Sequence, residues 1–247
     1  MEKSRVQGDE LMIYITGDIH GGLERIWNIQ HKYKLTKDDY IIVCGDFGII
    51  WQKTEVRRQL TKLRRCTEAT ILFVDGNHEN FDLLEEYPVI EKFGGKVGYI
   101  NDQVYHLRRG EVYDIDGHVF FCFGGAHSID QAYRIPHKSW WPEEIPTDDE
   151  IMHGSENLAV NLDRIEYVIT HEAPAIVRRQ IYTHHSAKFG EPLTYKLPSI
   201  FDNWLETVMF DAPNFKRWYC GHHHQNENFD TRGIPCTMLY RLEEEIQ

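Results

Sequence analysis

The first third of the chain alternates short apolar runs with segments in which apolar residues recur at helical spacing. The apolar runs at 12–15, 41–44 and 71–74 have the length and composition of buried strands. Amphipathic helices are expected after the first run and over residues 52–66, and Asn80 is placed to cap a short helix after the third. This alternation predicts a parallel sheet built from βαβ units.

Beyond residue 110 the hydrophobic pattern changes. Two strands, 112–115 and 118–123, are separated by Asp116-Gly117, which predicts a β-hairpin. Further strands are expected at 167–170, 218–220 and 236–242. Residues 128–156 contain three prolines and no clear period, which is typical of a long functional loop. With no repeat or linker in view, we expect a mobile leader at 1–11 and one domain over 12–247.

Composition narrows the class of protein. The 27 basic and 39 acidic residues give a net charge of −12, which argues against extended nucleic-acid binding because that requires clustered Lys and Arg. No apolar stretch approaches the roughly 18 residues of a membrane span. Five cysteines without a CxxC pair favour a reducing compartment. We therefore expect a cytoplasmic α/β protein without a membrane partner.

Polar residues flanked mostly by glycine follow five of the predicted strands. The runs are Gly17-Asp18-Ile19-His20-Gly21, Gly45-Asp46-Phe47-Gly48, Gly76-Asn77-His78-Glu79, Thr170-His171-Glu172 and Gly221-His222-His223-His224. The first three lie about one βαβ unit apart, so parallel strands bring them to the same edge of the sheet, where open α/β sheets bind ligands.

These runs supply oxygen and imidazole donors of a kind that binds metal ions. The seven candidate ligands are Asp18, His20, Asp46, Asn77, His171, His222 and His224. Two carboxylates, one amide and four imidazoles without a thiolate suit Mn²⁺, Fe or Zn²⁺, and do not resemble a closed structural zinc site. Seven ligands are too many for one ion that keeps an open position, so two ions sharing a carboxylate are expected. Reading all seven as capped strand ends leaves the histidines unexplained.

The ordered motifs GDxHG, GDxG, GNHE, a lone strand-end His and GHxH resemble the calcineurin-like metallophosphoesterase superfamily and span residues 17–224. The resemblance implies a four-layer α/β sandwich of two mixed sheets flanked by helices, with a dinuclear metal site at the carboxyl ends of the strands. It also implies two divalent ions, with Mn²⁺ favoured and Fe or Zn²⁺ as alternatives. One ion would be held by Asp18, His20, Asp46 and His224, and the other by Asp46, Asn77, His171 and His222.

By the same resemblance, a hydroxide bridging the two ions attacks phosphorus and His78 protonates the leaving oxygen. The second motif departs from the GDxVDRG pattern of the protein-phosphatase branch, because Asp46 is followed by Phe47-Gly48-Ile49-Ile50-Trp51. The arginine that would grip phosphate and the aspartate that would orient the histidine are therefore missing. Arg134, Lys138 and His127 are the candidates for substrate contact, and Glu79 or Glu172 for orienting His78.

The sequence thus predicts a metallophosphoesterase that acts on small phosphate esters, with a slight preference for phosphodiester or nucleotide-type substrates. The alternatives are a phosphomonoesterase, including protein Ser/Thr phosphatase-like activity, and a non-catalytic interaction module on the same fold. Arg108-Arg109 and Arg178-Arg179 are expected to be surface charges, and His223 to point away from the metals. The physiological substrate, native metal and oligomeric state are left open.

Overall fold

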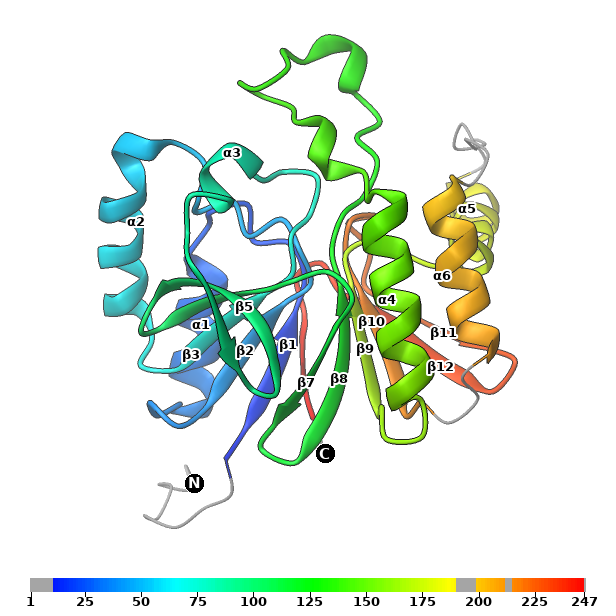
Figure 1. Ribbon diagram of the computed structural model, residues 1–247, viewed down its shortest axis with the longest axis horizontal. Helices are drawn as coiled ribbons and strands as arrows, with labels where there is room; N and C mark the ends of the chain where they lie inside the picture. Colours follow the sequence, from blue (N-terminus) through cyan, green and yellow to red (C-terminus); the bar gives the residue numbers. More distant parts are fainter. Residues whose placement is uncertain (1–10, 190–198, 212–214, 247) are drawn as a thin grey trace.

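Two β-sheets pack face to face, and helices cover the outer face of each sheet (Figure 1). This computed structural model describes residues 11–189, 199–211 and 215–246. The predicted leader, apart from Leu11, lies outside the described residues. In the part of the chain that is described, no helix is long and apolar enough to cross a membrane.

The first sheet has the strand order β13-β1-β2-β3-β6-β5-β4, in which β1, β2, β3 and β6 are parallel and the others antiparallel to their neighbours. Its strands are β1 (Ile13–Thr16), β2 (Tyr40–Val43), β3 (Thr70–Phe73), β4 (Val89–Lys92), β5 (Gly95–Asn101), β6 (Val104–Leu107) and β13 (Glu243–Glu245). The helices that accompany it are α1 (Glu24–Tyr33), α2 (Lys53–Cys66) and α3 (Phe81–Leu84).

The second sheet has the order β11-β12-β10-β9-β8-β7, with a parallel centre and antiparallel edge strands. Its strands are β7 (Glu111–Ile115), β8 (His118–Phe123), β9 (Tyr167–Thr170), β10 (Arg217–Cys220), β11 (Glu227–Thr231) and β12 (Ile234–Met238). The helices α4 (Asp148–Asn161), α5 (Ala175–Phe189) and α6 (Ile200–Asp211) lie beside it in Figure 1.

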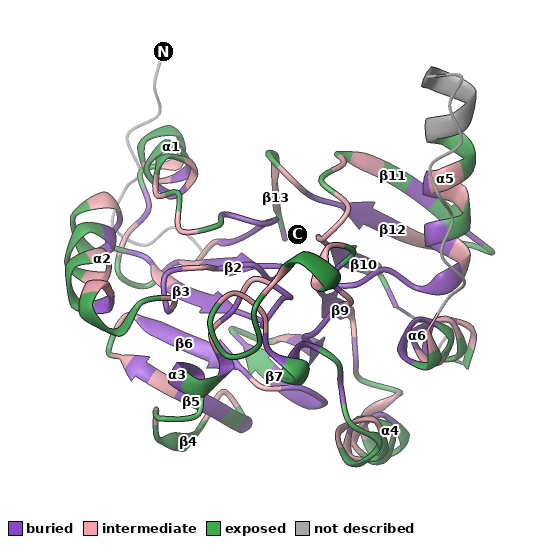
Figure 2. Ribbon diagram, turned by 90° about the horizontal axis from the view of Figure 1, so that it is seen from above, coloured by how far each residue is buried: buried purple, intermediate pink, exposed green. Residues whose placement is uncertain are grey.

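The alternation of side chains along each strand builds the four layers. Ile13 and Ile15 pack between the sheets with residues such as Phe120 of β8. Tyr14 lies between them in sequence and packs on the opposite face with Ile26 of α1. Because successive side chains of a strand point to opposite faces, a strand buried on both sides needs a continuous apolar run. Figure 2 shows the resulting buried strands enclosed by helices whose outer surfaces are exposed.

The second sheet is covered in the same way. Phe121 of β8 packs outward with Leu158 of α4 and Leu205 of α6. Its neighbours Phe120 and Cys122 face the first sheet. The predicted four-layer sandwich of two mixed sheets flanked by helices is therefore confirmed.

Several local predictions hold and others are wrong. The hairpin is present, with Asp116 and Gly117 both at positive φ, as its tight turn requires. The last predicted strand, 236–242, instead comprises the end of β12 and a connection that leads to the edge strand β13. The strands β4, β5, β6 and β11 and the helices α5 and α6 were not predicted.

The segment 128–156 is partly helical rather than one long loop. It contains two short 3₁₀ turns, Gln131–Tyr133 and Pro142–Glu144, and then the first part of α4. Thr147 caps α4 by accepting from the backbone of Glu150, whose side chain accepts from the backbone of Thr147 in return. In Figure 1 the segment between β8 and α4, residues 124–147, projects beyond the strand ends and is called the projecting segment below.

Two arginines expected at the surface are buried. Arg109 is 9% exposed and Arg178 is 8% exposed. Each is paired with a buried carboxylate, Asp75 for Arg109 and Asp202 for Arg178. The pairing explains the error, because a buried charge is tolerated when a charged partner compensates it.

Candidate metal centre

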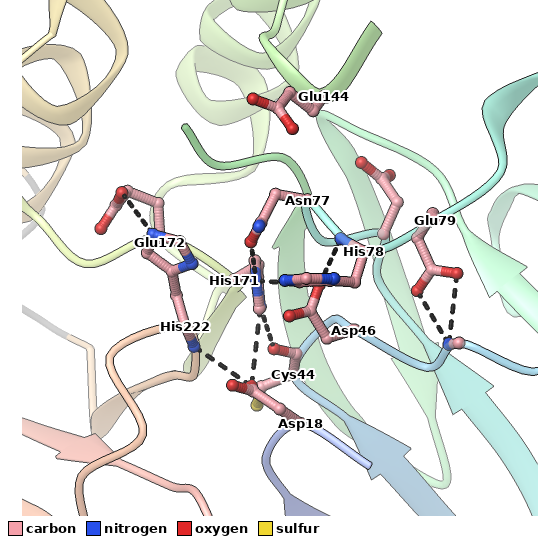
Figure 3. A network of polar contacts seen from close by, with 12 residues as sticks. Asp18, Cys44, Asp46, Asn77, His78, Glu79, Glu144, His171, Glu172 and His222 are labelled. Carbon is pink, nitrogen blue, oxygen red and sulfur yellow. Dashed lines mark hydrogen bonds and ion pairs between the residues drawn. The ribbon is translucent and has the colours of Figure 1, made fainter. Parts of the chain in front are cut away.

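The polar residues after five strands meet at one edge of the sandwich. Asp18 and His20 follow β1, Asp46 follows β2, and Asn77 and His78 follow β3. His171 follows β9 of the other sheet, and His222 and His224 follow β10. The two parallel centres thus deliver their carboxyl ends to a single place. Figure 3 shows the side chains of Asp18, Asp46 and His171 close together there.

The backbone at this edge is locally strained. His20, Asp46, His222 and His224 all have positive φ, between 47° and 65°. Such left-handed conformations are unfavourable for residues other than glycine and concentrate at functional sites. The fold therefore directs these four side chains through backbone turns that the strands alone would not adopt.

One group of donors has a geometry that suits a cation. The ligand atoms of Asp18, His20, Asp46 and His224 all lie within 4.8 Å of one another. The Nε2 atoms of His20 and His224 are 3.1 Å apart, and Nε2 of His224 lies 3.2 Å from Oδ2 of Asp18. Oδ2 of Asp18 is buried and, although His224 lies close to it, accepts no hydrogen bond of good geometry from the described residues. A divalent cation would satisfy this oxygen, since an unpaired buried carboxylate oxygen is otherwise costly.

A second group of donors surrounds His171, which is fully buried. Its Nδ1 lies 2.7 Å from the carbonyl oxygen of Cys44, so Nδ1 is the protonated donor and Nε2 is left for another partner. Nε2 faces Oδ1 of Asn77 at 3.1 Å and Oδ1 of Asp46 at 3.3 Å. Burial opposes a charge on this ring, but Asp46 and Asp18 raise the pKa of His171 to about 10. A metal ion bound at Nε2 would replace that proton.

His222 is placed less simply. Its ring centroid is 5.1 Å from that of His171, and its backbone N–H donates to Oδ1 of Asp18. Its Nε2, however, faces Oε2 of Glu172 at 3.6 Å. Burial lowers the pKa of His222 to about 3, although Glu172 opposes that shift, so the ring is neutral, as a metal ligand must be.

We expected His223 to point away from the metals, but its ring lies beside that of His222 and both rings face Glu172. Its Nε2 lies 2.8 Å from Oε1 of Glu172, and its ring centroid is 4.9 Å from that of His222. The donor atoms of Glu172, His222 and His223 form a second cluster able to hold a metal ion. Glu172 therefore faces the two histidines, and it is a site residue that the sequence suggested only as a partner for His78.

His78 lies beside the first group of donors. Its backbone N–H donates to Oδ1 of Asp46 at 2.7 Å, and its ring packs edge to face against that of His20. Neither carboxylate proposed to orient it does so in the structure. Glu79 accepts instead from the backbone N–H of Phe47, and Glu172 bonds His223.

An arginine also contacts the His78 ring. Nη1 and Nη2 of Arg134 lie 3.3 and 3.1 Å from the two ring nitrogens of His78. Arg134 is itself held by Asp130 at 2.7 Å. Burial and, to a smaller extent, the Arg134 charge lower the pKa of His78, which Asp46 opposes.

Two cavities open beside these residues. The larger, of about 600 Å³, is lined by Asp46, Asn77, His78 and residues 222–225 after β10, and also by Arg134 and His127. The smaller, of about 440 Å³, is lined by His20, His78, Trp51 and Arg58 among others. Of the three substrate-contact candidates, Arg134 and His127 therefore border the site. Lys138 is exposed and does not line either cavity.

Two buried residues were not predicted as site residues: Ser128, which bonds Asn77, and Glu144, which bonds Ser128. Both belong to the segment without hydrophobic period, where a lone serine and glutamate give no signal in the sequence.

The family model described as calcineurin-like phosphoesterase matches residues 11–226. The catalytic subunit of serine/threonine-protein phosphatase 4 from Eremothecium gossypii is 25% identical over 241 residues, which cover 87% of this chain and 73% of that protein.

Solved structures share the fold. A putative 5'-nucleotidase from Staphylococcus aureus matches with a TM-score of 0.52 and 14% identity, covering 94% of this chain. This chain spans about half of that protein, 49% of its length. GAP50 of Plasmodium, described as the anchor in the inner membrane complex, matches with a TM-score of 0.53 and 10% identity over 93% of this chain and 71% of its own.

Proposed function

The chain belongs to the calcineurin-like phosphoesterase family, whose members hydrolyse phosphoric esters at a dinuclear centre of divalent metal ions, and from this premise we propose that it is a two-metal phosphoesterase with a slight preference for phosphodiester or nucleotide-type substrates. The observation that carries the proposal is the convergence of donors from five strand ends, among them the close cluster of Asp18, His20, Asp46 and His224. A set of capped strand ends has no need of such an arrangement.

In this proposal, one ion is held by Asp18, His20, Asp46 and His224. The other is held by Asp46, Asn77, His171 and His222, with Asp46 shared. The fit is close for the first group and for Asn77 and His171, whose donor atoms already face one another. His222 fits if its Nδ1 is the ligand atom, because Nε2 faces Glu172. Oxygen and imidazole donors favour Mn²⁺, with Fe or Zn²⁺ as alternatives.

Two bound ions would lower the pKa of a water molecule between them and neutralise the phosphoryl oxygens. The residues of the chain supply the rest of the chemistry. His78 is proposed as the general acid that protonates the leaving oxygen. Its backbone bond to Asp46 fixes it at the metal edge. Arg134, which borders the larger cavity beside His78, is proposed to bind a phosphate oxygen through its guanidinium group.

The preference for diesters is supported by the two cavities. Both are lined by His78, and each also includes a residue proposed to bind metal, His20 in the smaller and Asn77 in the larger. A phosphodiester carries a substituent on either side of phosphorus, and two adjoining cavities offer room for both. A monoester would need only one of them.

The remaining parts of the proposal concern setting and partners. We expect a small phosphate ester as substrate rather than an extended nucleic acid, because the net charge is −12. The chain has four buried cysteine thiols and a fifth that is partly buried, which agrees with a reducing, cytoplasmic setting.

The test uses protein stripped of metal by a chelator and then supplied with Mn²⁺. Hydrolysis of bis-p-nitrophenyl phosphate and p-nitrophenyl phosphate is followed in both states. We expect turnover that requires Mn²⁺ and a higher kcat/KM for the diester. Turnover of the monoester alone would reverse the substrate preference. Turnover of neither substrate, together with no metal bound, would overturn the two-metal proposal in favour of an interaction module.

A further inference from the structure

Glu144 is a fully buried carboxylate close to the proposed metal centre. It ends the 3₁₀ turn Pro142–Glu144, and its exposed fraction is 0%. Its two oxygens accept hydrogen bonds from one residue, Ser128: Oε1 from the backbone N–H at 2.8 Å, and Oε2 from the hydroxyl at 2.6 Å. A carboxylate with so few partners at this depth is costly to bury, so its place in the structure calls for an explanation.

The hydrogen bonds continue from Ser128 to Asn77. Nδ2 of Asn77 donates to Oγ of Ser128 at 3.1 Å, and both residues are buried. Oδ1 of the same amide faces Nε2 of His171 at 3.1 Å. Glu144, Ser128 and Asn77 thus form a chain of hydrogen bonds that ends where the second ion is expected, and Figure 3 shows Glu144 and Asn77 on the same side of His171.

The Glu144 carboxylate decides which group donates in each of these hydrogen bonds. An ionised carboxylate can only accept, so the single hydrogen of the Ser128 hydroxyl must point to Glu144. Oγ of Ser128 is then available to Asn77 only as an acceptor. Asn77 must then present its NH₂ group to Ser128 and its carbonyl oxygen to His171. A metal ion binds the amide oxygen and not the NH₂ group, so this orientation is the productive one.

We propose that Glu144 is a positioning residue for the metal centre, acting through Ser128 to hold the Asn77 amide with its oxygen toward the second ion. This inference rests on the two-metal function proposed above. It assigns a role to two residues outside the strand-end motifs. Outer-sphere partners of this kind orient ligands and are worth roughly 10–100-fold in metal affinity.

Glu144 also links the proposed metal centre to the wall of the larger cavity. The backbone carbonyl of Glu144 accepts from the N–H of Ala126, and the neighbouring carbonyl of Glu143 accepts from Arg109. His127, the residue after Ala126, lines the larger cavity, and its Nδ1 lies 3.7 Å from Oε1 of Glu144. The segment that supports Asn77 is therefore anchored at both backbone and side chain.

Glu144→Gln tests these donor and acceptor roles with almost no change in side-chain volume. A glutamine can donate to Oγ of Ser128, which frees the serine hydroxyl to donate to Asn77 and permits the amide to turn over. Ser128→Ala removes the link itself. Glu143→Gln is the matched control, because Glu143 is adjacent and exposed.

The measurement is Mn²⁺ binding to the metal-free full chain, by calorimetry and by the electron paramagnetic resonance signal of coupled and isolated Mn²⁺. We expect two ions in the wild type and in Glu143→Gln. In Glu144→Gln and Ser128→Ala, one ion should bind unchanged and the other roughly 10–100-fold more weakly, leaving the signal of an isolated ion. If Glu144→Gln does not fold, Ser128→Ala carries the test alone.

Wild-type binding of both ions by folded Ser128→Ala and Glu144→Gln would overturn the positioning role. Equal weakening of both ions in these variants would also overturn it, because a general loss of structure does not discriminate between the ions. Failure of the wild type to bind two ions would instead count against the proposed function, so the two failures are distinguishable.

Discussion

Arg109 and Asp75 form a buried ion pair at the end of β3, with Nη2 and Nε of the arginine 2.6 and 3.0 Å from Oδ2 of the aspartate. The exposed fractions of the two side chains are 7% and 2%. Arg109 also bonds the Glu150 carboxylate and the carbonyl of Glu143. One guanidinium group therefore connects three parts of the fold. These are Asp75, which lies two residues before Asn77 after the end of β3, the projecting segment, and the start of α4.

Replacing Arg109 should destabilise the fold far more than replacing an exposed arginine. Arg109→Ala leaves the buried Asp75 carboxylate with His106 as its remaining side-chain partner, and breaking a buried pair in this way typically costs about 3–5 kcal/mol. Urea unfolding followed by circular dichroism measures the change. Arg58→Ala is the control, because its pair with Glu55 is exposed and pairs of that kind contribute about 0–1 kcal/mol. Similar midpoints for the two variants would contradict the prediction.

The contrast between Arg109 and the metal ligands shows what a sequence can reveal. The ligands follow from local information, since a polar residue after a buried strand must lie at a sheet edge, and parallel strands share that edge. Arg109 is placed by contacts with residues 34 to 41 positions away, and two adjacent arginines resemble surface charges until those partners are known. Ser128 and Glu144 could not be recognised for the same reason.

Secondary structure was missed for two different reasons. The start of α4 carries a sequence signal, because Thr147 and Glu150 form a capping box, but the prolines before it obscured the helix. The edge strand β4 carries little signal, because Val89, Ile90 and Glu91 are all exposed and show no alternation of buried and exposed positions. Its pairing with β5 decides its conformation.

Asp46→Asn should weaken the binding of both ions. Asp46 is the only residue shared by the two proposed ligand sets, and its oxygens face His20 at 3.8 Å and His171 at 3.3 Å. The loss should exceed the roughly 10–100-fold typical of an outer-sphere partner. Calorimetric titration with Mn²⁺ measures it, with His224→Ala as the control that should affect one ion only. Retention of one ion at wild-type affinity in Asp46→Asn would show that this carboxylate does not bridge.

His78→Ala should leave metal binding intact and slow turnover. The backbone N–H that bonds Asp46 is retained in the variant, so the ligand stays in place. Loss of a general acid typically costs about 10²–10⁴-fold, and the loss should be largest for esters whose leaving group is a poor one. Rates for a series of aryl phosphate diesters of increasing leaving-group pKa test this. A variant that loses metal but acts normally once metal is saturating would assign His78 to the ligands instead.

Arg134→Ala should raise KM, whereas Lys138→Ala should not. Both residues lie in the projecting segment, but Arg134 lines the larger cavity beside His78 and Lys138 does not. A hydrogen bond to a charged group contributes about 1.5–3 kcal/mol, so KM should rise about tenfold or more. Steady-state kinetics with the diester measure both variants. An unchanged KM in Arg134→Ala, or an equal rise in Lys138→Ala, would remove Arg134 from the substrate site.

Gly45→Ala should disrupt the site by displacing His171. A Cβ at position 45 would lie 2.2 Å from Nδ1 of His171, the atom that bonds the Cys44 carbonyl, and φ of Gly45 is +85°. Gly117 is a matched control, because its φ is +81° and a Cβ there would have no atom of the described residues within 4 Å. Gly117→Ala therefore carries the same left-handed strain of about 1–2 kcal/mol without a clash. Thermal unfolding and Mn²⁺ titration should show a larger loss of stability in Gly45→Ala, together with weakened binding of one ion. Equal melting temperatures and intact binding in both variants would mean that His171 can move without leaving the site.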